Sequence, residues 1–416
     1  MKKVLLILLI LFIGFGGYIL YDNYFDKSIP KLNVEEKIID IDDIYIYGTH
    51  LNLSGTLVDD NNLEFVLYDG KFNNYKINIK EDYFNFSDQI NNGLYLDDIP
   101  VGKYYAFIRS KNKDDNDEDI YKYYVINNNT EYKEMTYYTL SKTGNKIIIN
   151  TDTEYNTLTF NVSKNKDKGI YDVVIDPGHG GIDSGASKNG YNEADMTMKI
   201  ALNLKNKFEK YGLSVKLTRE ENQLSKDEKL NDYGVHGRAV IPFEVKAKYI
   251  FSIHMNSNAS SKVNGIELYT PQNINYDFVK EVANNISKIA NIGYSSNKVN
   301  KVFDGVYTRV FNESDIESSK KGFLDKGMKP YDVTTKSNYY FMIRETGGIV
   351  TGAYVDDRND SIEANPYVKS NVATEAYLFE LGYISNVNDL NNIKDNTDKI
   401  TNAIADTFNN HFVSNE

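Results

Sequence analysis

The hydrophobic pattern changes at a polar connector, residues 163–169, with the sequence SKNKDKG. Before it, from residue 31 to 163, short β-rich runs such as DIYIYGTHLNLSGTLV and IYKYYVI alternate with clusters of Asn, Asp and Gly. Several short runs of period two at regular spacing are typical of antiparallel sandwiches. We therefore expect residues 31–163 to form an all-β, sandwich-like domain that serves as a spacer or a binding module.

Beyond the connector, residues 170–416 alternate near-continuous apolar runs with helical patterns. Met196, Ile200, Leu204 and Phe208 recur at intervals of four, which places them on one face of a helix that Gly212 would end. Further helices are expected over residues 276–293 and from about Thr397 to Phe412. Apolar strands between helices indicate a mostly parallel sheet flanked by helices. The predicted fold class is thus α/β for this domain, preceded by the all-β domain.

The first 30 residues read as a membrane anchor and a linker. Lys2 and Lys3 precede an uncharged run from Val4 to Tyr21, and about 18 apolar residues approach the length that crosses a bilayer. The positive start predicts an inside N-terminus with the rest of the chain outside. No small-x-small cleavage site follows the run, so we expect an uncleaved single-pass transmembrane helix over a removed signal peptide. Both alternatives export the bulk of the chain.

Composition excludes two kinds of site. The formal net charge is −12, which argues against a nucleic-acid partner bound by broad phosphate neutralisation. The chain has no cysteine, so disulfides and thiolate metal sites are ruled out. Any metal must therefore be held by His, Asp or Glu side chains.

Four such side chains are expected at one edge of the sheet. His179 follows the strand VVID, His254 ends the strand YIFSIH, and Glu380 ends EAYLF. Glu193 opens the helix after the first strand and its loop. Functional groups of open α/β sheets gather beyond the carboxyl ends of the strands, so these residues should converge.

The chemistry of this set suits Zn²⁺. A catalytic zinc uses three protein ligands and leaves a position for water, and two histidines with one glutamate would supply them. The remaining carboxylate could take the proton of the water and deliver it to a leaving nitrogen. Glycines around His179 let the backbone pass beneath a substrate without a Cβ atom in the way. These residues indicate a site for amide hydrolysis.

The same segments resemble the N-acetylmuramoyl-L-alanine amidase family, the zinc amidases of peptidoglycan turnover. The segments are VVIDPGHGGIDSGA, NEADMTMKIA, TRE, GRAVIPFEVKAKYIFSIHMNS and AYLFELGYISNVND, and they cover roughly residues 170–412. By that resemblance His179, Glu193 and His254 match the zinc ligands and Glu380 matches the catalytic glutamate. The implied reaction is hydrolysis of the amide between the lactyl group of N-acetylmuramic acid and L-alanine.

The N-terminal helix implies a place at the membrane with the catalytic domain on the cell-wall side, and the resemblance implies peptidoglycan as the partner. It leaves room for an unidentified protein activator. Two alternatives stay open: a zinc peptidoglycan endopeptidase or carboxypeptidase, and a wall-binding scaffold with weak or regulated amidase activity. Long inserts at 294–337 and 345–372 depart from the family pattern and prevent a carry-over of substrate preference.

Other polar residues near the motifs are mostly expected to have structural roles or to be exposed. Asp176 and Asp183 are expected to form turns or support the metal ligands. Arg238 could orient the metal loops, bind substrate or form a salt bridge at a helix start. Arg344 is interpreted as an exposed loop charge, with a contact to a substrate carboxylate as the alternative. Two further histidines, His236 and His411, are expected to be structural or exposed.

Overall fold

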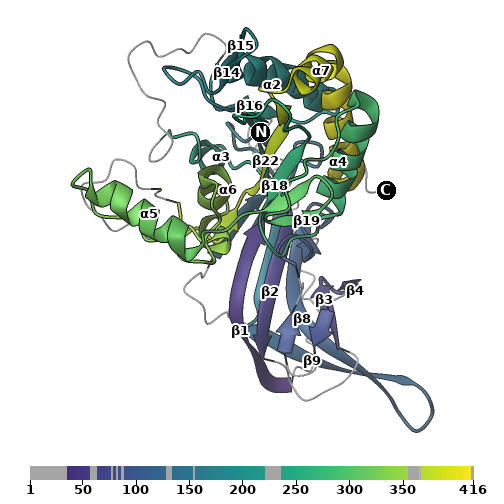
Figure 1. Ribbon diagram of the computed structural model, residues 1–416. Helices are drawn as coiled ribbons and strands as arrows, with labels where there is room; N and C mark the ends of the chain where they lie inside the picture. The colour runs from purple at the N-terminus through teal and green to yellow at the C-terminus, as the bar shows by residue number, and fades with distance from the viewer. Residues whose placement is uncertain are drawn as a thin grey trace, which may run out of the picture.

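The computed structural model describes residues 35–56, 63–75, 78–80, 83–85, 89–127, 134–152, 155–220, 236–354, 365 and 367–413. Within these ranges the chain forms two large sheets, one in each half (Figure 1). The predicted anchor at residues 1–30 lies outside the described residues. Among the helices that are described, none combines the length and the apolar character needed to cross a bilayer.

The N-terminal half is all-β, as predicted. Its strands are β1 (Glu35–Tyr47), β2 (His50–Thr56), β3 (Leu63–Tyr68), β4 (Phe72–Tyr75), β5 (Asn78–Lys80), β6 (Tyr83–Asn85), β7 (Leu94–Tyr95), β8 (Gly102–Lys113), β9 (Asp119–Asn127), β10 (Glu134–Tyr138), β11 (Asn145–Thr151) and β12 (Leu158–Lys164). The main path of hydrogen-bonded neighbours runs β10-β11-β12-β8-β9-β1-β2-β6-β5. Most pairs are antiparallel, whereas β1 and β9 run parallel.

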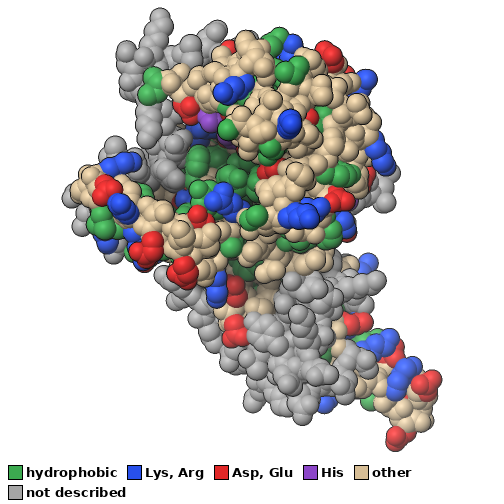
Figure 2. Space-filling view, in the orientation of Figure 1, with side chains coloured by type: hydrophobic (Ala, Val, Ile, Leu, Met, Phe, Trp, Pro, Cys, Tyr) green, Lys and Arg blue, Asp and Glu red, His purple; other side chains and the backbone are tan. Residues whose placement is uncertain are grey.

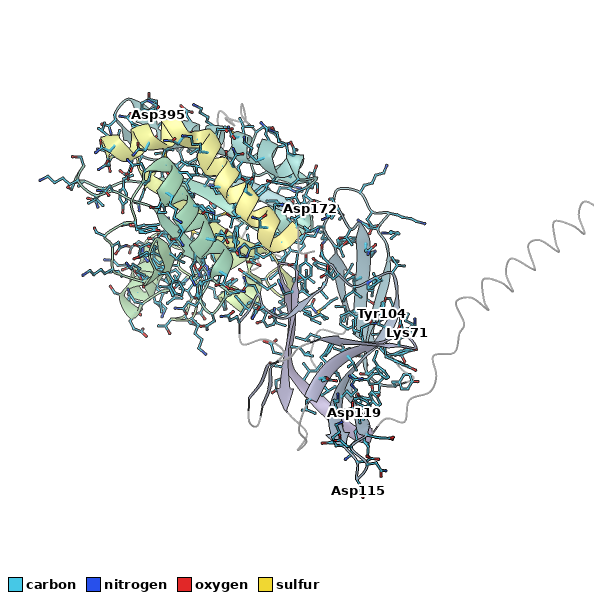
Figure 3. The ribbon with its side chains drawn as sticks, turned by 90° about the vertical axis from the view of Figure 1, so that its right-hand side faces the viewer. Lys71, Tyr104, Asp115, Asp119, Asp172 and Asp395 are labelled. Carbon is cyan, nitrogen blue, oxygen red and sulfur yellow. The ribbon has the colours of Figure 1, made fainter. Side chains whose placement is uncertain are left out.

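This sheet differs from the expected pair of separate sheets. The long strand β1 pairs with β9 through its first part and with β2 through its second part, and its register shifts between Ile41 and Asp43. One strand therefore belongs to both halves of a continuous sheet that encloses an apolar core, which includes Ile44, Phe65 and Phe160. Figure 3 shows the paired strands β8 and β9 reaching away from the rest of the molecule, with Asp115 at the tip.

The C-terminal half contains the predicted α/β sheet. Its strands are β13 (Val173–Pro177), β16 (Val215–Leu217), β17 (Tyr249–Asn256), β18 (Glu267–Thr270), β19 (Lys301–Phe303), β20 (Val306–Thr308) and β22 (Glu375–Tyr383), in the spatial order β16-β13-β17-β22-β18-β20-β19. Strands β16, β13, β17 and β22 run parallel, and β18 is antiparallel to β22. Two short strands, β14 (Ser187–Lys188) and β15 (Tyr191–Asn192), form a separate ribbon.

Helices cover both faces of this sheet because successive strand residues point to opposite sides. Val173 and Ile175 pack into the larger core with α2 (Glu193–Lys210), α4 (Asp277–Ala290) and α7 (Val387–Phe408). Val174 points the other way, into a smaller core that contains residues of α3 (Ile241–Glu244) and α6 (Phe341–Thr346). The remaining described helices are α5 (Glu313–Leu324), η1 (Gly348–Thr351) and η2 (Asn409–Val413).

One expectation about the helices was wrong in detail. The last helix begins at Val387, ten residues before the predicted start, because the Asn386 side chain accepts hydrogen bonds from the backbone N–H groups of Asn388 and Asp389. The Asn- and Asp-rich first turns conceal this start, and a kink at Asn396 separates them from the apolar remainder. The polar insert 294–337 contains α5, which opens with a capping box formed by Asn312 and Asp315.

The two halves meet at the amino ends of β17 and β22. The short strand β21 (Val372–Ala373), which comes from the C-terminal half, pairs in parallel with β1. The hydroxyl groups of Thr49 and Tyr249 lie 2.8 Å apart, and the Asn91 amide donates to Oε1 of Glu375 at 2.8 Å. Asp172 lies near this junction in Figure 3. The N-terminal sheet is therefore packed against the amino ends of β17 and β22, opposite the predicted site.

Candidate metal centre

Glycines bring the first histidine to the site. His179 follows β13 and has a φ of 61°, in the left-handed region. A Cβ atom on Gly178 would lie 2.4 Å from the His254 ring, and one on Gly185 would lie 2.7 Å from the His179 ring. The absence of these two Cβ atoms therefore lets the loop fold tightly around both imidazoles.

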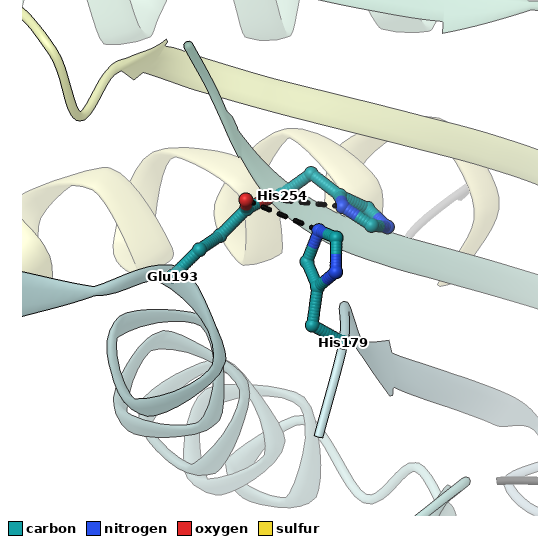
Figure 4. Close-up of side chains that lie close together, drawn as sticks. All are labelled: His179, Glu193 and His254. Carbon is teal, nitrogen blue, oxygen red and sulfur yellow. Dashed lines mark hydrogen bonds and ion pairs between the residues drawn. The ribbon is translucent and has the colours of Figure 1, made fainter. Parts of the chain in front are cut away.

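The Glu193 carboxylate joins the two imidazoles. Its Oε2 lies 3.1 Å from Nε2 of His179, and its Oε1 lies 3.2 Å from Nδ1 of His254 (Figure 4). The backbone N–H groups of Ala186 and Met255 also donate to this carboxylate, at 3.1 and 3.0 Å. Glu193 is the first residue of α2, so the helix N-terminus also favours its negative charge.

The geometry fits a metal ion with three protein ligands. One donor atom from each of His179, Glu193 and His254 lies within 4.8 Å of the other two. Two imidazole nitrogens and a carboxylate oxygen form a ligand set of catalytic zinc sites. The second ring nitrogen of His179, Nδ1, lies 2.8 Å from Asp183, so a proton held there leaves Nε2 available for a metal.

Neighbouring charges shift the protonation of this cluster. Burial opposes protonation of His179, but the carboxylates of Glu193 and Asp183 outweigh it and raise its pKa. Burial also favours the neutral form of Glu193, yet hydrogen bonds from both histidines and the charge of His254 hold its pKa far below the ordinary value. The site therefore keeps a charged carboxylate between two nitrogen donors, as a divalent cation requires.

Glu380 lies on the neighbouring strand, beside these residues. It is the register partner of His254 on β17 and of Glu267 on β18. Its Oε2 atom is buried and has no hydrogen-bond partner within the described part of the chain. Burial raises its pKa well above the ordinary value, and the charges of Glu193 and Glu267 add to this shift. A raised pKa suits a group that takes up and returns a proton near neutral pH.

Two arginines hold the strand ends that carry the site. Arg238 donates to both carboxylate oxygens of the buried Asp176, at 2.9 and 2.8 Å, so it supports the loops. Asp176 thus acts as an anchor, and Asp183 supports a histidine, as predicted. Arg219 donates to the carbonyl oxygens of Pro177 and Ala194, at 3.0 and 2.8 Å, which ties the histidine loop to α2.

The structural or exposed roles predicted for Arg344, His236 and His411 had different outcomes. Arg344 is buried on α6 and donates to Glu345 at 2.9 Å, so its interpretation as an exposed loop charge was wrong. His236 is exposed and pairs with Glu244, and His411 pairs with Glu281, so both lie away from the metal cluster, as predicted.

Glu267 was missed in the sequence. It is buried beside Glu380, and its carboxylate accepts hydrogen bonds from the hydroxyls of Tyr269 and Tyr383, at 2.6 and 2.8 Å. An acid in the apolar run GIELYT is the same signal that identified Glu380. Figure 2 shows a hollow on this face whose floor is lined by hydrophobic side chains. The side chains of His179 and His254 are 26% and 16% exposed, so the cluster can be reached from outside.

Comparison with known proteins assigns the C-terminal half. Residues 173–410 match the family model described as N-acetylmuramoyl-L-alanine amidase. A probable cell wall amidase, LytH of Staphylococcus saprophyticus, is 39% identical over 100 residues, which cover 23% of this chain and 30% of LytH. An endolysin of Bacillus phage SPP1 is 30% identical over 168 residues, which cover 40% of this chain and 49% of the endolysin.

Among solved structures, the catalytic domain of CwlV, an N-acetylmuramoyl-L-alanine amidase from Bacillus (Paenibacillus) polymyxa var. colistinus, is similar at 20% identity. Its TM-score is 0.37, and the match covers 58% of this chain and 98% of CwlV. The matches span about half or less of the length of the two curated relatives. The family model, however, extends over residues 173–410 of the 416 residues, which is more than half of the chain. The protein therefore belongs to the N-acetylmuramoyl-L-alanine amidase family.

Proposed function

We propose that the chain is a zinc-dependent amidase that hydrolyses the bond between the lactyl group of N-acetylmuramic acid and L-alanine in peptidoglycan. The observation that carries this proposal is the convergence of His179, Glu193 and His254, with Glu380 on the adjacent strand. The family match supports the choice of bond.

The residues of the site have two separate roles, metal binding and proton transfer. His179, Glu193 and His254 would hold the zinc ion, which supplies Lewis acidity and lowers the pKa of a water ligand to about 7. Glu380 accepts the proton of the attacking water and delivers it to the leaving nitrogen of L-alanine. Burial of the Glu380 Oε2 atom keeps bulk water from competing for that proton.

Product analysis tests this proposal. Purified protein is incubated with peptidoglycan, and the soluble products are identified by mass spectrometry. We expect stem peptides with a free L-alanine amino group, and glycan with free lactyl carboxylates. Release of D-alanine or of peptide fragments cut elsewhere would instead indicate a carboxypeptidase or endopeptidase. Binding without release would indicate a scaffold.

We further propose that the chain works at the cell membrane, facing the wall, with residues 1–30 as a single-pass anchor. The support is Lys2 and Lys3 before the uncharged run Val4–Tyr21. Fractionation of cells that express the whole chain, or the chain from residue 31, tests this. The whole chain should sediment with membranes and resist carbonate extraction, and recovery of the whole chain in the soluble fraction would contradict the anchor.

We also propose that residues 31–163 and 170–416 are separate modules. One apolar core supports this division: the core that includes Phe65 draws its buried residues from the N-terminal half alone, whereas the larger C-terminal core also takes in Leu140. Expression of residues 170–416 alone tests it: a folded, active fragment supports two modules, and an insoluble fragment indicates that the two halves fold as one unit.

A further inference from the structure

A second cavity adjoins the edge of the sheet that carries Glu380. Its volume is about 490 Å³, within the usual range of ligand pockets. Aromatic side chains line much of it, and the polar lining comes from Asp315, Ser318, Ser319 and Arg344. One lining residue, Tyr340, packs against Tyr269 with ring centroids 4.6 Å apart. Tyr269 in turn donates to Glu267, the register partner of Glu380, so the cavity lies beside the residues that surround Glu380.

Arg309 packs against two residues that line this cavity. Its guanidinium carbon lies 3.4 Å from the ring centroid of Tyr339, and its nearest carboxylate oxygen, on Asp315, is 3.7 Å away. Both neighbours line the cavity. The backbone N–H of Tyr339 donates to the carbonyl of Arg309 at 2.8 Å, which fixes the two residues relative to each other. The side chain of Arg309 is 32% exposed, so a ligand can reach it.

Arg309 differs from the buried arginines near the site in how its N–H groups are used. Arg238 donates to both oxygens of Asp176, and Arg344 donates to Glu345 and to the carbonyls of Asn338 and Tyr339. A distance of 3.7 Å to Asp315 is too long for a hydrogen bond. Arg309 also hydrogen-bonds Tyr340. Because a guanidinium carries five N–H donors, Arg309 still retains donors for a ligand.

Arg309 is connected to the site through a series of packed side chains. It stacks on Tyr339, whose ring centroid lies 5.6 Å from that of Tyr340. Tyr340 packs on Tyr269, which donates to Glu267 beside Glu380. A peptide stem that runs from the site toward the cavity would therefore bring one of its groups to Arg309.

We propose that Arg309 binds a free carboxylate of the peptide stem, and that the aromatic cavity receives the stem residues beyond it. This proposal rests on the proposed amidase function. The peptide is favoured over the glycan because N-acetylated sugars carry no free carboxylate once the lactyl group is in an amide. A guanidinium matches a carboxylate with two parallel hydrogen bonds, and stacking on Tyr339 holds it ready.

Two substrates separate this role from a structural one. They are disaccharide tripeptides that differ only in having a free α-carboxylate or a carboxamide on the second residue of the stem. For Arg309→Gln we expect kcat/KM on the carboxylate form to fall about tenfold, mainly through KM, as for loss of one charged hydrogen bond. The amide form should be hydrolysed as by the wild type. The kcat/KM of Arg309→Lys on the carboxylate form should lie between those of the wild type and Arg309→Gln, because lysine keeps the charge and loses the planar fork.

The control is Lys320→Gln, which removes a partly exposed charge from α5 and should change neither substrate. Binding of both uncleaved tripeptides to the Glu380→Gln protein, measured by calorimetry with and without Arg309→Gln, gives the comparison without turnover. Equal losses on both substrates, or no loss on either, would overturn the carboxylate role. If the wild type cleaves neither tripeptide nor intact peptidoglycan, the amidase proposal itself fails.

Discussion

The two ends of the strand pair β17–β22 carry matching polar residues with different uses. At the carboxyl end His254 is the register partner of Glu380, and at the amino end Tyr249 is the register partner of Glu375. Both glutamates are acids on one strand: Glu375 is buried, and Glu380 is half-buried with its Oε2 atom enclosed. Burial raises the pKa of each, that of Glu375 to about 7. Neither the residue type nor a raised pKa alone therefore separates a catalytic acid from a structural one.

The two ends of the strand pair differ in what covers them. Glu375 accepts hydrogen bonds from Asn91 and Tyr377, and a Cβ atom on Gly48 would lie 2.6 Å from its Oε2. The N-terminal sheet thus closes the amino end, whereas the carboxyl end holds the metal cluster, whose histidines are partly exposed. In parallel sheets the carboxyl ends of strands serve function, and here the opposite ends serve the junction between the two halves.

The largest effect that tests this contrast between the two strand ends is expected from a substitution of Glu193. Replacement by Gln removes the anionic ligand between the two imidazoles, so zinc affinity should fall by more than about 100-fold and hydrolysis to background. Zinc content by mass spectrometry and stem-peptide release measure the two effects. Asp195→Asn is the control, because Asp195 is an exposed acid of the same helical turn. Full zinc occupancy in Glu193→Gln would contradict the assigned ligand set.

The next effect compares the two glutamates of β22 directly. Glu380→Gln should lower kcat by about 10²–10⁴-fold, the usual contribution of a general base, with zinc content unchanged. Glu375→Gln should leave kcat unchanged, because Glu375 lies at the closed end of the strand. Rates of stem-peptide release from peptidoglycan, at saturating substrate, provide the test. Similar losses in both variants would mean that the two ends are not functionally distinct.

The third effect is the pH dependence of stability that Glu375 adds. Its pKa is raised from 4.5 to about 7 in the folded protein, so between these values the folded state retains a proton that the unfolded state has lost. The contribution of Glu375 is therefore most favourable below pH 4.5 and declines by about 3 kcal/mol as the pH rises through 7.

Urea unfolding of the wild type and Glu375→Gln at several pH values isolates this contribution, since both proteins share all other titrating groups. The free energy of unfolding of the wild type, relative to the variant, should fall from pH 5 to pH 7.5. A constant difference between the two proteins over this range would show that Glu375 does not titrate there.

The smallest effect tests how tightly the junction is packed. Gly48 and Gly169 both have positive φ, 61° and 75°, so alanine at either position is strained by about 1–2 kcal/mol. Only at Gly48 would the added Cβ collide with Glu375, whereas at Gly169 no atom lies within 4 Å. Gly48→Ala should therefore lose about 1–3 kcal/mol more than Gly169→Ala in urea unfolding. Equal losses would indicate that the junction yields to the extra methyl group.

Much of the site was predictable because its residues stand at recognisable points of a parallel sheet. Strand ends and a helix start located His179, Glu193, His254 and Glu380, and period-four apolar spacing located α2. Glu267 could have been found by the same signal as Glu380. Arg309 could not, because it follows a short strand in an insert and its meaning depends on Tyr339 and Asp315, which come from other elements.

The sequence by itself determined the two hydrophobic patterns, the exclusion of thiolate ligands and the residue types available for a metal, because these depend on composition and local spacing. Only the tertiary structure decided that Glu375, at the other end of β22 from Glu380, is sealed by the N-terminal sheet. It also decided that one strand, β1, joins both parts of that sheet and pairs with β21. Such contacts join segments hundreds of residues apart, and no local pattern specifies them.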